Sequence, residues 1–410
     1  MGRPKKIKDT SNRVFTINME KQIAAAPVTK CRNGKWVSFG KDNKYPYHLL
    51  GLYNTSPTLR ACCSFAVQSV IGEGVDWDSM QLDGSQMRPN YQYSWSDFIR
   101  RISLDYFLYG SYSFQIIKNR DNKTYSFYHV PIDSLRCSPR DEDGVITSWW
   151  ISNDWTTTGS TPPVEVDSFI MRSDREYNIP MGKPFVYVYE SYQPSVNYYY
   201  QPCWASSMKA VQAEGEFLNY DLRMASNCFV PSGSLSLPPM DTEEQKQAMI
   251  AEVNKMFVGT DNANSILISF RNDSDDSPVK FEPFTSSNEN VDMFAESDYR
   301  NTTRILSAFQ IPSRNLVGLT EKKTGMASQG QMLQTAFNAY MTLTGKNNRD
   351  VILGTINELF AMNGIDVEIV VKELSFLDGD GETKSETPDT QEAPETGQDI
   401  TENNVEEKVS

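Results

Sequence analysis

The sequence predicts an α+β fold in which a strand-rich segment is flanked by helical segments. Apolar residues recur at helical spacing before about residue 110 and again after residue 204. Between them, residues 112–200 contain short runs rich in Trp, Tyr and Val, separated by clusters of turn residues, which is typical of strands. A chain of 410 residues, 39% of them hydrophobic, has room for two or three domains and a sizeable core.

Two helices are expected at the start of this pattern. The first carries three leucines and follows Pro46. Ser56 is a good N-cap and Pro57 suits the first helical position, because its missing N–H would have no partner there. The second helix should therefore run over residues 57–71 and stop at Gly72.

A third helix is predicted over residues 98–108, where apolar side chains fall on one face. Either Ser96 or Asp97 is expected to cap it, because both side chains can accept hydrogen bonds from the first turn. Gly110 should end it, since glycine is favoured just after a helix.

A β-hairpin should come next. Residues 112–117 alternate in polarity and form a half-buried strand, and residues 125–130 form its partner across a turn at 120–123. The segments VITSWWIS and PFVYVYES predict further strands.

Long helices follow. One spans residues 204–229, and a second is capped by Asp241 or Thr242, with Glu243 and Glu244 placed favourably for the helix dipole in its first turn. The remaining expectations are the strands SILISF and VKFEPF flanking a turn, a helix over 290–310 ended by Pro312, a long helix over 328–345, a shorter helix over 349–362 and the strand VEIVV.

The stretch GLTEKKTGMASQGQML interrupts this last helical region with a polar loop. Gly318 and Gly325 bracket it, and glycine reaches backbone angles closed to other residues. Lys322 and Lys323 lie at the expected tip. From the residues alone, an ordinary solvated turn between helices explains this stretch better than a functional loop does.

The charge balance constrains the partners. The net charge is −14 and the pI is about 4.8, which disfavours a static clamp on nucleic acid but permits an acidic wall past which DNA slides. Residues 378–410 hold eleven Asp or Glu against Lys384 and Lys408, with almost no apolar residues, and are expected to be disordered. No run of about 18 apolar residues occurs, so no membrane partner is expected.

Signatures of catalysis are missing. His48 and His129 are the only histidines, and their surroundings favour packing or surface roles. The six cysteines lack the spacing of metal ligands, and no Walker, HExxH, GxSxG or GxGxxG motif is present. We therefore expect a structural or interaction protein without catalytic residues, metal or cofactor.

The order of these elements resembles the portal proteins of tailed double-stranded-DNA bacteriophages. Three stretches carry the resemblance over about residues 40–370: GKDNKYPYHLLGLYNTSPTLRACCSFAVQSVIGEGV, the helix–glycine–strand step SLDYFLYGSYSFQII, and ILSAFQIPSRNLVGL, a helix that ends in a proline and a short apolar turn. The resemblance implies the portal fold: an N-terminal arm (1–39), a wing (40–203), a stem helix (204–229), a clip (230–289), a second stem helix (290–315), a tunnel loop (316–330), a spine helix (331–345), a short crown (346–376) and the acidic tail (377–410).

The resemblance also implies a function. A ring of about twelve subunits would occupy one capsid vertex and pass double-stranded DNA without sequence specificity during packaging and ejection. The implied partners are the terminase large subunit, the head–tail adaptor, and the major capsid protein or scaffold. The protein would be found in the virion, and in the host cytoplasm during assembly. The residues implied to face DNA are Thr320, Lys322, Lys323, Thr324 and Gln329, and those implied to dock partners from the clip are Glu243 and Glu244.

Two other classes stay open at this stage. Another head or tail structural protein, such as an adaptor, connector or baseplate component, would form a ring without a loop lining its channel. An enzyme such as a nuclease or peptidase would need a constellation of catalytic side chains that the sequence lacks.

Overall fold

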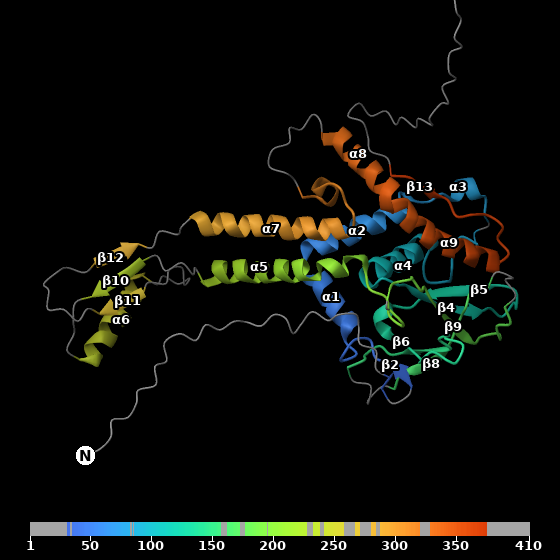
Figure 1. Cartoon of the computed structure of the whole chain (residues 1–410), viewed down its shortest axis with the longest axis horizontal. Helices are drawn as coiled ribbons and strands as arrows, with labels where there is room; N and C mark the ends of the chain where they lie inside the picture. Colours follow the sequence, from blue (N-terminus) through green and yellow to red (C-terminus); the bar gives the residue numbers. More distant parts are fainter. Residues whose placement is uncertain are drawn as a thin grey trace, which may run out of the picture. The chain divides into compact units, whose positions relative to one another are not determined.

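The computed structural model has the expected α+β class (Figure 1). It describes residues 31–32, 35–82, 84, 86–156, 162–172, 177–194, 196–227, 233–237, 242–257, 267–270, 280–283, 288–319 and 329–374. The acidic tail and most of the expected N-terminal arm lie outside these residues.

The first two helices form as predicted. They are α1 (Tyr45–Thr55) and α2 (Pro57–Ile71). The Ser56 side chain accepts a hydrogen bond from the backbone N–H of Leu59 at 3.0 Å, which confirms the cap. Gly72 ends α2 at a φ of 59°, in the region that favours glycine.

The cap expected for the next long helix was wrong. After the short α3 (Trp77–Met80), α4 (Trp95–Tyr109) is capped by Ser94, which lies two residues before Ser96. Ser94 and Asp97 form a capping box, in which each side chain takes a hydrogen bond from the other's backbone N–H. Gly110 ends α4 at a φ of 81°, as expected.

A six-stranded sheet follows α4, in the spatial order β5-β4-β9-β8-β7-β6. Neighbouring strands are antiparallel except for the parallel pair β8 and β9. The expected hairpin is the pair β4 and β5. The strands are β4 (Ser113–Lys118), β5 (Tyr125–His129), β6 (Leu135–Cys137), β7 (Ser148–Ile151), β8 (Val164–Ser168) and β9 (Pro184–Val188).

One face of this sheet packs against helices. Tyr112, Phe114 and Ile116 are fully buried as predicted, but Ser113, which was expected on the opposite, polar face, is fully buried too and donates to the Val130 carbonyl. The Phe114 ring lies 5.6 Å from that of Phe98 on α4, centroid to centroid, and the Tyr112 hydroxyl is 2.6 Å from that of Thr355 on α9 (Lys346–Met362). We call α1–α4, this sheet and α9 the sheet module.

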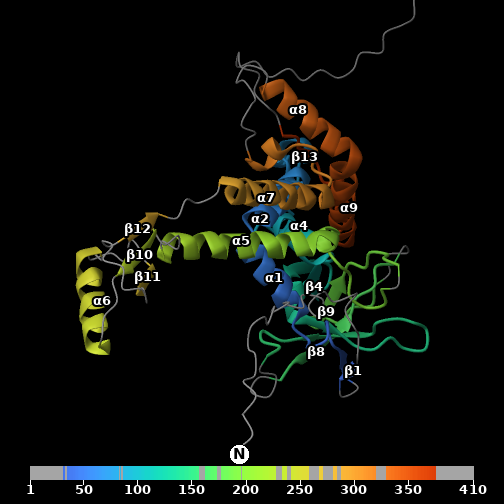
Figure 2. The same cartoon turned by 60° about the vertical axis from the view of Figure 1, so that its left-hand side comes forward.

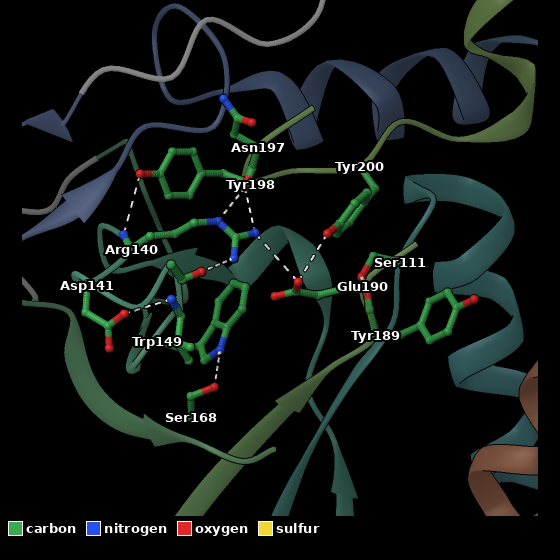
Figure 3. Close-up of polar contacts among 12 residues, drawn as sticks. Ser111, Arg140, Asp141, Trp149, Ser168, Tyr189, Glu190, Asn197, Tyr198 and Tyr200 are labelled. Carbon is green, nitrogen blue, oxygen red and sulfur yellow. Dashed lines mark hydrogen bonds and ion pairs between the residues drawn. The ribbon is translucent and has the colours of Figure 1, made fainter. Parts of the chain in front are cut away.

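Polar contacts tie the far end of the sheet to the chain that leaves it (Figure 3). The Arg140 guanidinium donates hydrogen bonds to the carbonyls of Asn197 and Gly144 and lies 3.6 Å from the Glu190 carboxylate. The Tyr200 hydroxyl donates to the same carboxylate at 3.3 Å. These bonds hold Glu190, Asn197 and Tyr200 on the turn between β6 and β7, just before the chain enters its long helices.

Two long helices then lie side by side (Figures 1 and 2). The predicted helix over 204–229 begins as a 3₁₀ turn, η3 (Cys203–Ser207), and continues as α5 (Met208–Asn227). Its partner is α7 (Asn288–Ala308). Glu214 on α5 is buried and accepts hydrogen bonds from the hydroxyls of Ser56 and Thr58, which ties the start of α5 to the sheet module.

Between α5 and α7 in the chain lies a small sheet with a strand that the sequence analysis missed. Its order is β11-β10-β12, so the two predicted strands, β11 (Leu267–Phe270) and β12 (Lys280–Pro283), both pair with β10 (Gly233–Leu237) and not with each other. The helix α6 (Glu243–Phe257) separates β10 from β11 in sequence.

The expected break between the last two helices was wrong. A π-helical turn (Met341–Gly345) joins α8 (Gln329–Tyr340) to α9 without interruption. The first of these helices was expected to end at Gly345, but Gly345 has helical angles. A Cβ there would lie 2.5 Å from the Met341 sulfur, so glycine serves close packing at this point.

The short strands complete the fold. The expected strand VEIVV is reduced to its last residue, because the N–H of Ile369 donates to the Asn357 side chain at 2.8 Å instead of to a strand. The remaining pairs are β1 (Cys31–Arg32) with β2 (Trp36–Val37) and β3 (Gly74–Val75) with β13 (Val371–Lys372).

Candidate functional site

The segment that leads into the candidate loop leaves α7 through a fixed turn. The helix ends at Ala308, and Gln310 adopts a φ of 56°, which is uncommon for a residue other than glycine. The N–H of Ile311 donates back to the carbonyl of Leu306 at 3.0 Å and closes the turn. The helix therefore ends before Pro312, which was expected to end it.

A short 3₁₀ turn, η4 (Arg314–Val317), carries the chain to the loop. The Ser313 side chain accepts a hydrogen bond from the N–H of Asn315 at 3.3 Å and caps this turn. Gly318 follows with a φ of 80°, in agreement with the backbone freedom expected of it. The chain thus reaches the loop from an anchored start.

The loop residues themselves fall mostly outside the described residues. This holds for Thr320, Lys322, Lys323 and Thr324, so the structure neither brings them together nor separates them. Gln329 is the first residue of α8, and its side chain also lies outside the described part. Their DNA-facing role stays a prediction.

Apolar contacts anchor the chain before the loop and the C-terminal end of the helix α8 that follows it. On the incoming side, Leu316, Val317 and Leu319 pack against the core of the sheet module. On the outgoing side, the Tyr340 ring of α8 lies 4.8 Å from the Phe65 ring of α2, centroid to centroid. Burial raises the pKa of the Tyr340 hydroxyl to about 12, so this group stays neutral at physiological pH.

An open groove of about 510 Å³ lies between α7, η4 and α8. Arg314 lies along it, with its guanidinium carbon 4.2 Å from the centroid of the Tyr299 ring. The same guanidinium donates to the Tyr299 carbonyl at 3.3 Å and to the Thr303 hydroxyl at 3.4 Å. This cluster could not be predicted from the sequence, because Arg314 and Tyr299 are brought together only by the turn after α7.

Glu243 and Glu244 lie in the first turn of α6, as predicted, and both are exposed. The Thr242 hydroxyl accepts from the N–H of Gln245 at 3.4 Å, which identifies Thr242 as a cap, while Asp241 lies outside the described residues. Glu243 also pairs with Lys246 in its own helix at 2.9 Å. A cluster of this kind can offer negative charge to a partner, but no structural feature tests that role.

The described residues contain no group of three or more His, Cys, Asp or Glu side chains that could hold a metal ion. His48 is exposed on α1, and the Nε2 of His129 lies 2.9 Å from the carboxylate of Asp105 within the sheet module. Among the helices in the described ranges, none combines the length and apolar character needed to cross a membrane.

Comparison with known proteins identifies relatives in fold. The sequence model of the family described as phage portal protein matches residues 70–390. Among curated proteins, none matches the chain.

Three solved structures of gene transfer agent (GTA) particles contain a chain with a similar fold. In the neck of the native particle computed with C12 symmetry, the TM-score is 0.53 at 15% identity, covering 79% of this chain and 83% of that one. The neck of the empty particle computed with C6 symmetry gives 0.53 at 14% identity, covering 78% and 83%. The virion of the native particle gives 0.52 at 15% identity, covering 79% and 83%.

Proposed function

This chain belongs to the phage portal protein family, and we propose that it closes into a ring of about twelve subunits at one vertex of a capsid, with a central channel that passes double-stranded DNA. Because the matching family model is that of portal proteins, the alternative of an adaptor or connector is not favoured. DNA would enter through the ring during packaging and leave through it during ejection.

The ring is inferred from an apolar stripe on α5 that extends beyond the part of the chain that buries it. Val211 is fully buried, and Leu218 and Leu222 follow on the same helical face, seven and eleven residues later. Yet Leu218 is 45% exposed and Leu222 is 65% exposed. A single chain leaves these side chains in water, and a neighbouring subunit in a ring would cover them through a heterologous contact.

The likeness in fold to a chain of a particle neck computed with C12 symmetry supports the same proposal. By this analogy, the sheet module without α9 is the wing, α5 and α7 are the stem, and β10–β12 with α6 are the clip. The loop after Gly318 is the tunnel loop, α8 is the spine, and α9 belongs to the crown.

In such a ring, every subunit would present Lys322 and Lys323 to the channel axis. Duplex DNA offers one negative charge per about 1.7 Å of its axis, so weak and salt-sensitive contacts are available at every position. Such contacts carry no sequence information, which suits a packaging channel.

Packaging in assembled particles tests this role. Lys322→Ala with Lys323→Ala should leave fold and ring unchanged, because surface substitutions usually shift the free energy of unfolding by less than about 0.5 kcal/mol. Genome packaging or retention should fall, and the double Glu variant should be worse than the double Ala variant because repulsion is added. Lys41→Ala with Lys123→Ala, two exposed positions in the sheet module, is the matched control. A full genome held normally by the Glu variant would refute the DNA-facing role.

The exposed first turn of α6 is proposed to dock the terminase large subunit during packaging and the head–tail adaptor afterwards. Glu243→Lys with Glu244→Lys should weaken both contacts and spare the ring. Glu142→Lys with Asp143→Lys, at an exposed turn of the sheet module, controls for the change in net charge. Normal packaging and tail joining in the α6 variant would remove this assignment.

The same proposal places the protein in the virion, and in the host cytoplasm while particles assemble. The outer surface of the wing would meet the major capsid protein or a scaffold. The passing duplex would be a transient partner.

A further inference from the structure

The charge of the chain reverses sign in one segment. Residues 299–349 contain seven Lys or Arg and a single carboxylate, Glu321, although the whole chain carries −14. The segment covers the end of α7, η4, the loop and α8 up to the start of α9. The two lysines of the loop are therefore part of a longer basic region, which composition averaged over the chain conceals.

Within this region, the helix α7 has one buried face and one exposed face. Its inner face buries Ile305 and Leu306 against the sheet module and α5. Arg300 and Arg304, one turn apart, lie together on the exposed face. The Arg300 side chain is 55% exposed, and its carboxylate neighbour Glu296 is 3.9 Å away, at the limit of an ion pair.

The guanidinium groups of Arg304 and Arg314 also lack a close carboxylate that would neutralise their charge among the described residues. The Nη1 of Arg304 donates to the Asn301 side chain at 3.5 Å, a neutral acceptor. Arg314 is held on the Tyr299 ring and uses one nitrogen for the Tyr299 carbonyl and the Thr303 hydroxyl. No described carboxylate forms an ion pair with either side chain.

We propose that Arg300, Arg304 and Arg314 form a second contact belt for the phosphate backbone of double-stranded DNA, next to the tunnel loop. This inference rests on the proposed ring, in which the exposed face of α7 turns toward the channel. Arg314 is pre-oriented by Tyr299, so little side-chain freedom is lost on contact. Arg300 and Arg304 are free to follow a moving backbone. The belt would recognise phosphates and no bases.

A different use of the same charges is pairing with carboxylates of the next subunit. The exposed Glu216 and Asp221 on α5 are available for it. Pairing of this kind would make the arginines necessary for the ring itself, and the test separates the two uses.

The test compares DNA binding by purified wild-type rings and by rings with Arg300→Gln and Arg304→Gln. The probes are a linear duplex and a covalently closed duplex circle of the same sequence, because only the linear form can thread a closed ring. Fluorescence anisotropy is measured over a series of salt concentrations, and native mass spectrometry first establishes the ring. Arg100→Gln, at an exposed position of α4, is the matched control.

We expect linear DNA to bind wild-type rings more tightly than the circle. In the double Gln variant, the magnitude of the slope of log K against log salt for linear DNA should fall by at least about 2, since each lost phosphate contact removes about 0.9 and every subunit of the ring loses two arginines. Arg300→Lys with Arg304→Lys should keep most of the slope, because the charge remains. The control should match wild type.

Three outcomes would overturn the inference. One is an unchanged salt slope in the double Gln variant; another is equal binding of linear and circular DNA. The third is loss of the ring in the Gln variant, which would assign the arginines to subunit contact. If wild type itself forms no ring, the proposed function fails instead, and the mass spectrum reports that separately.

Discussion

The sheet module buries its apolar side chains within one chain, whereas the distal half of α5, from Phe217 on, leaves apolar side chains exposed. Phe114, Ile116 and Phe127 are fully buried within one chain. Leu218 and Leu222 continue a stripe whose first turns are equally well buried, yet about half of their surface lies in water. Both regions come from sequences with clear apolar periodicity, so periodicity alone does not say which chain provides the cover.

The difference separates apolar surface that is buried when one chain folds from apolar surface that is buried only when subunits associate. A sheet packed between helices satisfies its apolar surface locally, and its stability should not depend on protein concentration. An amphipathic helix that extends past its support gains stability only when a neighbour arrives. Substitutions in each of the two regions test this difference.

The largest effect is expected from the exposed stripe. Leu218→Asp with Leu222→Asp should abolish the ring, because a charge at a subunit contact must be desolvated without a partner. Circular dichroism of the same variant should match wild type, since these side chains are already exposed in one chain. Met181→Asp, which is 60% exposed in the sheet module, is the control and should keep the ring. Rings that persist in the stripe variant would place the subunit contact elsewhere.

The next effect belongs to the buried side of the comparison. Phe114→Ala should reduce the free energy of unfolding by about 3–5 kcal/mol, through lost burial and the cavity left behind. Urea unfolding measures this best in the background of the stripe variant, where assembly does not contribute. Leu222→Ala is the matched truncation on the exposed side and should cost less than about 0.5 kcal/mol in a single chain. Similar losses in the free energy of unfolding for the two substitutions would show that the two regions do not differ in burial.

A smaller effect is expected where the two regions join. Glu214→Gln removes the charge from a buried carboxylate that accepts from the Ser56 and Thr58 hydroxyls, and should cost about 1–3 kcal/mol. Glu216→Gln, two residues further on and exposed, should be nearly neutral. Thermal unfolding of both variants decides the point, and equal melting temperatures would show that Glu214 does not anchor α5.

Local signals predicted much of the fold. Ser56 with Pro57, Gly72 and Gly110 marked helix boundaries correctly, because caps depend on a few adjacent residues. The strand β10 was missed although GSLSL alternates, since it is short and flanked by glycine and proline-rich turns. The helix end expected at Gly345 was wrong. Glycine often ends a helix, but here its close packing against Met341 explains a glycine inside the helix.

The candidate site was less predictable. Gly318 could be identified from sequence, because a positive φ is a property of one residue. The stacking of Arg314 on Tyr299 could not, since fifteen residues and a turn separate them in the chain. The basic run over residues 299–349 was visible in the sequence, but its meaning depended on knowing that α7 buries the side opposite Arg300 and Arg304.

The central claim is that one chain is incomplete and a closed ring completes it. Native mass spectrometry of the wild-type chain at micromolar concentration tests this most directly. We expect a single closed oligomer of about twelve subunits, with an adjacent number tolerated in rings formed outside a capsid. Only monomers or dimers at that concentration would contradict it.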